Sequence, residues 1–138
     1  MWVVVHFKDG RLLKGFTRDF TPTKTVFHLT SEQDKDRGSE YEIDLFDLKA
    51  VFFVKTLEGN KDYSEKKRFE EIDSSGRKGL KIKAEFTDGE VIRGISLGYS
   101  KSVKGFFIIP VDPESNNERI FINAESCRDI KVGAAAEQ

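Results

Sequence analysis

A stretch near the start of the chain recurs in its second half at a constant spacing. Residues 6–16 have the sequence HFKDGRLLKGF, and residues 85–95, which lie 79 positions later, have the sequence EFTDGEVIRGI. The same spacing holds without a gap as far as Val51 and Ile130. One shared turn would not align so long a segment, so the sequence predicts a duplicated unit.

Each copy has the pattern of short β-strands. Asp-Gly between apolar stretches is a strong hairpin signal, and both copies continue with further apolar, β-branched stretches such as TVFHLT and GFFIIPV. Gly15 and Gly94 lie inside predicted strands, where glycine costs stability and marks a bend or bulge. The predicted fold class is therefore all-β, with two tandem small barrels.

The predicted domain boundaries follow from this repeat. We expect the first barrel over residues 1–58, a charged linker over 59–79, the second barrel over 80–133 and a disordered tail over 134–138. The centre of the linker can form a short helix, because Asp62 and Glu65 have the spacing of a capping box. A barrel of about 55 residues buries only ~60% of its unfolded surface, so we expect the copies to pack together or to oligomerise.

Composition and motifs exclude several function classes. Lys and Arg total 23 against 24 Asp and Glu, so no global field attracts nucleic acid or anionic lipid. The single cysteine cannot form an intrachain disulfide, and no apolar run reaches the length of a membrane span. Phosphate-loop, dinucleotide and nucleophile-elbow motifs are absent. The sequence predicts a cytoplasmic protein that is not an enzyme, with no catalytic residues, metal site or cofactor.

Two partial resemblances bear on the fold. The stretch DGRLLKG followed by short strands resembles the Sm-like RNA-binding proteins, which implies an SH3-like barrel. Thr21 and Thr25 stand where that family carries Asp and Asn in its RNA-binding loop, and the family's later Arg-Gly pair has no counterpart. The resemblance therefore implies the barrel without its RNA site.

Residues 66–100 resemble a degenerate PilZ domain, a bacterial barrel that binds cyclic di-GMP. That family uses a pair of arginines spaced by three residues, whereas this chain has Arg68 followed by Ile72. Of the family's later Asp, Ser and Gly, only Ser96 remains. Residues 3–60 also resemble a bacterial domain family of unknown function, which implies a bacterial source and brings no activity. Cyclic-dinucleotide binding is not expected.

Basic and aromatic loop residues are the candidates for binding. Phe20 and Tyr99 match at the same spacing, and aromatic rings beside basic groups suit single-stranded nucleic acid. The alternative is that these rings close the barrel ends and the charges form a solvated rim. We expect His6 to face solvent and His28 to be partly buried. The candidate binding residues are Arg18, Phe20, Lys24, Arg93, Tyr99, Lys101 and Lys104.

The stretch KAVFFVK is apolar on both faces of its predicted strand. Such a strand needs a second packing partner, so Phe52 or Phe53 is expected to contact the other barrel or another subunit. The predicted function is a non-catalytic binding or adaptor module that acts through protein contacts in the bacterial cytoplasm. The alternative is recognition of a ligand or nucleic acid, as a degenerate PilZ-like receptor or a Sm-like RNA binder.

Overall fold

The computed structural model describes residues 1–72 and 78–138, and within these the chain contains ten strands and no α-helix. The all-β prediction is confirmed. Four short 3-10 helices punctuate the chain: η1 (Leu45–Asp47), η2 (Phe69–Glu71), η3 (Ala124–Ser126) and η4 (Gly133–Glu137). The strands are β1 (Trp2–Phe7), β2 (Leu12–Phe16), β3 (Val26–Ser31), β4 (Glu40–Asp44), β5 (Leu48–Val54), β6 (Leu80–Phe86), β7 (Val91–Ser96), β8 (Gly105–Pro110), β9 (Asn117–Asn123) and β10 (Cys127–Val132).

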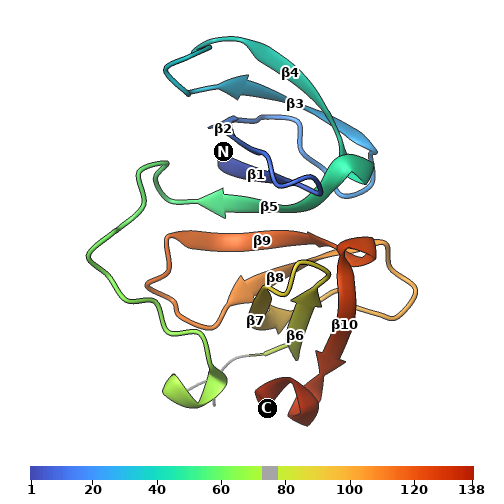
Figure 1. Ribbon diagram of the computed structural model, residues 1–138. Coiled ribbons are helices and arrows are strands. Elements are labelled where there is room, and N and C mark those ends of the chain that lie inside the picture. Colours follow the sequence, from blue (N-terminus) through green and yellow to red (C-terminus); the bar gives the residue numbers. More distant parts are fainter. Residues whose placement is uncertain (73–77) are drawn as a thin grey trace.

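All ten strands belong to one antiparallel sheet in the order β10-β6-β7-β8-β9-β5-β1-β2-β3-β4. Figure 1 shows β5 and β9 lying side by side where the two halves meet. The expected two separate barrels do not form, because β5 pairs with β9 of the other half and does not close onto β4 of its own. The reason lies in the side chains: β9 offers Ile120 and Ile122 to the apolar β5, whereas β4 is rich in carboxylates.

The β5·β9 pair has a hydrophobic core on each face. Val51 and Phe53 of β5 lie in the core of the first half together with Phe121 of β9. Phe52, on the opposite face of β5, lies in the core of the second half with Ile120. Both faces of the junction are therefore buried, which explains the unbroken apolar run of β5.

The two Asp-Gly turns have the predicted hairpin geometry. Gly10 and Gly89 adopt φ of 92° and 94°, a conformation that glycine reaches without steric cost. Asp9 accepts a hydrogen bond from the Arg11 backbone N–H at 3.0 Å, and Asp88 accepts the equivalent bond from Glu90 at 3.0 Å. Each Asp side chain therefore stabilises its own turn.

The strand glycines allow the next strand to approach closely. A Cβ atom at Gly15 would lie 2.1 Å from the Thr30 carbonyl oxygen, and one at Gly94 would lie 2.4 Å from that of Ile109. The register irregularities of the sheet fall at other positions. Glycine is therefore required at both sites by space, and no bulge is involved.

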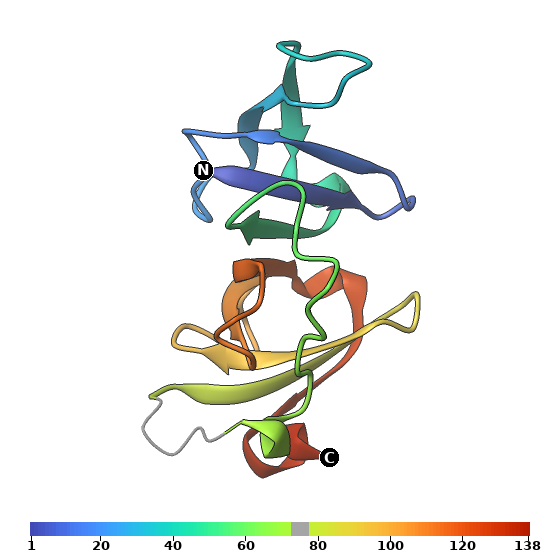
Figure 2. The same ribbon diagram turned by 90° about the vertical axis from the view of Figure 1, so that its left-hand side faces the viewer.

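The described part of the linker contains no α-helix but has the three-residue 3-10 helix η2 (Phe69–Glu71), and residues 73–77 lie outside the described part. The buried Asp112 carboxylate accepts hydrogen bonds from the Tyr63 hydroxyl at 2.5 Å and from the Lys66 backbone N–H at 2.8 Å. Because the Lys66 backbone N–H donates to this carboxylate, it does not form the hydrogen bond to the carbonyl four residues earlier that an α-helix requires. The linker instead runs along the second half, as Figure 2 shows.

The tail over residues 134–138 was expected to be disordered, but the structure shows it ordered. It forms most of η4, and Ala136 is fully buried in a small core with Phe69, Ile95 and Val111. The linker and the tail therefore meet on one face of the second half, at the lower end of Figure 1.

Candidate functional site

An open groove with an aromatic floor lies on the outer face of β1 and β2. Side chains alternate along β1, so that Val3 and Val5 enter the core while Trp2 points outward and stays 41% exposed. Trp2 lies directly opposite Phe16 in the β1·β2 ladder, and their rings pack edge to face with centroids 5.0 Å apart. The groove has a volume of about 560 Å³ and is called the Trp2 groove below.

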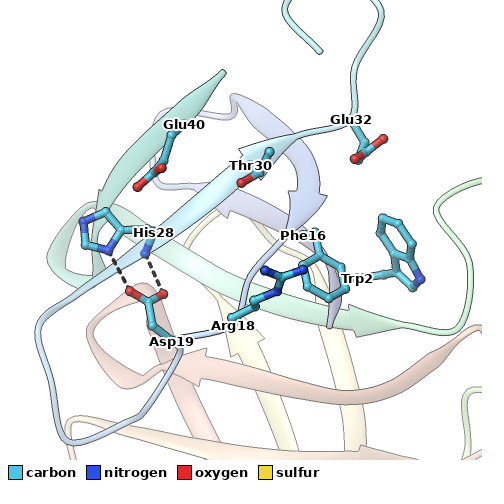
Figure 3. Close-up of a pocket in the computed structure, with 8 residues that line it drawn as sticks. All are labelled: Trp2, Phe16, Arg18, Asp19, His28, Thr30, Glu32 and Glu40. Atoms are coloured by element: carbon cyan, nitrogen blue, oxygen red, sulfur yellow. Dashed lines mark hydrogen bonds and ion pairs between the residues drawn. The ribbon is translucent and has the colours of Figure 1, made fainter. Parts of the chain in front are cut away.

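Charged side chains surround these rings. The guanidinium of Arg18 lies 5.3 Å from the centre of the Phe16 ring, a cation–π distance. Figure 3 shows the remaining lining residues across the groove, where His28 and Asp19 face each other. Thr30, Glu32 and Glu40 complete the lining.

Asp19 holds His28 through two hydrogen bonds. Its carboxylate accepts from the His28 backbone N–H at 2.9 Å and lies 2.6 Å from Nδ1 of the ring. The hydrogen bond to this carboxylate raises the pKa of His28, and the same contact lowers the pKa of Asp19. In the described residues no hydrogen bond joins the His28 ring to a hydroxyl or thiol. The Asp19 carboxylate therefore fixes the orientation of the His28 ring beside the groove.

The matching face of the second half has the same pairing geometry. At the spacing of 79, Trp2 corresponds to Lys81 and Phe16 corresponds to Ile95. Lys81 lies directly opposite Ile95 in the β6·β7 ladder, as Trp2 does opposite Phe16. The two outer faces can therefore be compared residue by residue.

This second face is covered by the chain itself. Ala136 of η4 and Phe69 of η2 pack against Ile95, which is only 4% exposed. Glu137 forms an ion pair with Lys81 at 2.7 Å. Within the described residues no such segment packs on the equivalent face of the first half, where Trp2 is 41% exposed and Phe16 is partly exposed.

A family model matches residues 1–134, which include all ten strands and the Trp2 groove. The chain belongs to DUF6982, a family of unknown function. Neither the curated proteins nor the solved structures contain a match to this DUF6982 chain. In the part of the chain that the structure describes, no helix is both long and apolar enough to cross a membrane.

The predicted aromatic platforms of the DUF6982 chain, Phe20 and Tyr99, are partly buried against other rings. Phe20 packs edge to face against Phe53 at 5.1 Å and against Phe121 at 5.3 Å, and so lies between the two halves. Tyr99 packs against Phe106 at 4.8 Å. Each ring thus packs against a core and remains partly exposed.

The predicted basic residues are dispersed. Arg18 lines the Trp2 groove, and the Arg93 guanidinium donates to the main-chain oxygen of Gln138 at 3.0 Å. Lys101 is exposed on a turn. Lys24 and Lys104 are brought together, since they line one hollow of about 280 Å³ at the end of the junction.

Phe52 and Phe53 lie at the junction of the two halves. Phe52 is 8% exposed and packs in the core of the second half, while Phe53 is 3% exposed in the first. The Arg119 guanidinium of β9 lies 4.5 Å from the centre of the Phe53 ring. The second packing partner that their strand requires is thus the other half of the same chain.

Both histidine expectations were wrong. His6 stacks on Phe52 with centroids 4.3 Å apart and is half-buried, whereas the His28 side chain is 48% exposed. The groove itself was also missed, although one signal was present. Strict alternation in WVVVHF, with Val3 and Val5 inside, places Trp2 on the outer face.

Proposed function

We propose that this DUF6982 chain is a non-catalytic binding module that acts through protein contacts in the bacterial cytoplasm, with the Trp2 groove as its binding surface. One observation carries the proposal. The outer face that the second half covers with the chain's own η2 and η4 is open in the first half, with Trp2 and Phe16 at its centre. Trp and Arg are the side chains most enriched among the energetically dominant residues of protein interfaces.

Charge favours a protein over a nucleic acid as the partner. Three carboxylates line the Trp2 groove against Arg18 and the titratable His28. Nucleic-acid affinity rests mainly on neutralising phosphates with cations, and a groove with this balance offers little of that attraction. A protein segment can present both signs of charge and an apolar side chain to the rings.

The thiol gives no support to an enzymatic alternative. Cys127 is half-buried, and burial raises its pKa to about 11, so its reactive thiolate form is scarce at neutral pH.

We further propose that the two halves are copies of one ancestral unit. The 3-10 helices η1 and η3 begin at Leu45 and Ala124, which are 79 positions apart. Each is capped by the preceding side chain, since Asp44 accepts from Phe46 N–H at 2.9 Å and Asn123 accepts from Glu125 N–H at 3.1 Å. The close contacts at Gly15 and Gly94 show the same correspondence.

The test is a selection of displayed peptides on the folded chain, with Trp2→Ala as the counter-selection. Trp2 is the only tryptophan, so its fluorescence reports directly on occupancy of the groove. We expect peptides whose binding changes the Trp2 emission and is lost in Trp2→Ala. Leu97→Ala is the matched control, because Leu97 is 80% exposed elsewhere on the surface and its removal should leave binding intact.

Two further ligands separate the proposal from the alternative class. Calorimetric titration at physiological salt with short single-stranded RNA and with cyclic di-GMP should give no binding. Micromolar binding of either ligand, together with an empty peptide selection, would overturn the protein-binding proposal.

A further inference from the structure

We infer that the Trp2 groove recognises a short acidic and apolar protein segment, of the same chemistry as the segment that covers the second half of the chain. This inference rests on the proposed function and specifies its ligand. It is carried by a comparison between the two outer faces, one covered and one open.

The covered face shows which chemistry this surface holds. A small apolar residue, Ala136, is fully buried against Ile95. A carboxylate follows directly, and Glu137 pairs with the Lys81 ammonium at 2.7 Å. The covering segment therefore places an apolar side chain on the apolar centre of the face and an acid on its flanking cation.

A second pair of cations extends this contact. The Lys83 ammonium donates to the main-chain oxygen of Gln138 at 2.8 Å, and the Arg93 guanidinium donates to the same atom at 3.0 Å. The face thus combines one apolar centre with three cations, and what lies on it is apolar and rich in oxygen acceptors.

The open face also places cations beside an apolar centre, although only Lys14 stands at the position of a cation of the covered face. Lys14, Phe16 and Arg18 alternate along the outer side of β2 and its extension, so that a cation lies on each side of the aromatic ring. At the spacing of 79, Lys14 takes the place of Arg93 and Phe16 the place of Ile95. Lys14 also borders the second hollow beside Trp2.

The positive charge of these two residues is not neutralised by the chain. Among the described residues, neither Lys14 nor Arg18 forms an ion pair. Two of the three carboxylates of the groove already have partners, since Asp19 contacts His28 and Glu32 pairs with Arg37 at 2.8 Å, and the third, Glu40, lies beside His28 (Figure 3). The unpaired cations beside the rings therefore favour a carboxylate on the partner.

Two of the three cations of the covered face have apolar counterparts on the open face. Where the second half has Lys81 and Lys83, the first has Trp2 and Val4, and Arg18 stands where the second half has Leu97. The open face therefore has a larger apolar area and one cation fewer. We expect a ligand with a larger apolar side chain than Ala136, such as leucine or phenylalanine, next to one or two acidic residues.

The experiment is the composition of the peptides that bind the folded chain in a Trp2-dependent manner. We expect Asp and Glu to be enriched within two positions of an apolar residue in that pool. In the variant Lys14→Glu/Arg18→Glu, the same peptides should lose about tenfold in affinity for each cation reversed. A new selection on this variant should favour Lys and Arg.

The variant Lys24→Glu/Lys104→Glu is the control, because its two cations lie together in a different hollow. It should bind the acidic peptides as the unmodified chain does. A Trp2-dependent pool without acidic enrichment, or acidic peptides that bind the Lys14/Arg18 variant undiminished, would overturn this inference and leave the protein-binding function standing. A selection with no Trp2-dependent peptide at all would overturn the protein-binding function itself.

Discussion

The strands at the centre of the sheet and those at its edges occupy equivalent places in the two halves, yet they differ in chemistry. At the spacing of 79, β5 corresponds to β10 and β9 corresponds to β4. In the central pair, Phe52 lies opposite Ile120, whereas their edge counterparts are Lys131 and Tyr41. In the described residues β4 pairs only with β3, and β10 pairs only with β6.

We infer from this difference that the side chains of a strand decide whether it pairs with a second neighbouring strand. Phe121 at the centre packs among the rings of the first core, and its edge counterpart is Glu42. Charged residues on an exposed edge strand oppose further strand addition. Strands at matching positions are thus paired across the centre of the sheet and left unpaired at its edges in the described residues.

The largest effect is expected from placing an edge residue at the centre. Phe121→Glu would bury a carboxylate beside Phe20 and Phe107, whose ring centroids lie 5.3 and 5.1 Å from that of Phe121. We expect a loss of at least about 4 kcal/mol in the free energy of unfolding, from lost packing and a desolvated charge. Urea denaturation measures it. Glu42→Gln at the edge should change stability by less than about 0.5 kcal/mol, and similar losses for the two variants would remove the distinction between centre and edge.

A smaller loss is expected from the glycines that the two halves share. Gly15→Ala and Gly94→Ala each push a methyl group against a backbone carbonyl oxygen at 2.1 or 2.4 Å, so each should cost about 1–3 kcal/mol in unfolding free energy. Gly98→Ala is the control, because no atom lies within 4 Å of the added carbon. If only one of the two strand glycines tolerates alanine, the two halves differ in the contact between their second and third strands.

Giving the edge strand β4 the side chains of the central strand β9 tests the difference between centre and edge in the opposite direction. The triple variant Glu40→Arg/Tyr41→Ile/Glu42→Phe gives β4 the residues that β9 carries at the matching positions. We expect the variant to associate through its β4 edge, so that its sedimentation coefficient rises with concentration beyond that of the unmodified chain. Glu42→Gln alone should not have this effect. Unchanged sedimentation of the triple variant would show that these side chains do not protect the edge.

Local features of the fold could be predicted from the sequence, whereas contacts between distant segments could not. The Asp-Gly turns depend on backbone geometry within one hairpin and were predicted correctly. The two strand glycines were predicted to mark a bend or bulge, whereas their role is to make room for the next strand. The partners of Phe20 include Phe107 and Phe121, far away in the other half, so its burial has no local signal. The prediction for the linker failed for the same reason, because the Lys66 backbone N–H donates to Asp112, which is distant in the sequence.

The candidate site divides in the same way. Alternation along β1 was sufficient to place Trp2 outside, once Val3 and Val5 were assigned to the core. The pairing of Asp19 with His28 depends on a loop that returns to β3, and no spacing rule indicates it. That the equivalent face is covered by η4 was likewise hidden, because the tail has no strong apolar pattern.

The smallest expected effect contrasts a histidine beside the junction with one near the edge. His6 stacks on Phe52, and desolvation, followed by the Lys49 charge, lowers its pKa below 6.5. His28 lies on β3, next to the edge strand, and Asp19 raises its pKa above 6.5. A pH titration followed by NMR should therefore give a pKa below 6.5 for His6 and a pKa above 6.5 for His28. Asp19→Asn should return His28 toward 6.5 and leave His6 unchanged.

The two shifts have opposite consequences for stability. The folded state binds the His6 proton less well than the unfolded state, so stability falls as the pH drops from 6.5 through the lowered pKa of His6. The contact of His28 with Asp19 stabilises the fold below pH 6.5, and this contribution is lost as the pH rises through the raised pKa of His28. Since the His28 ring is exposed, its contribution should be the weaker one. His6→Phe should reduce the acid sensitivity of the urea midpoint, whereas His28→Phe should increase it slightly. The opposite signs would contradict the assignment of the buried ring to the junction.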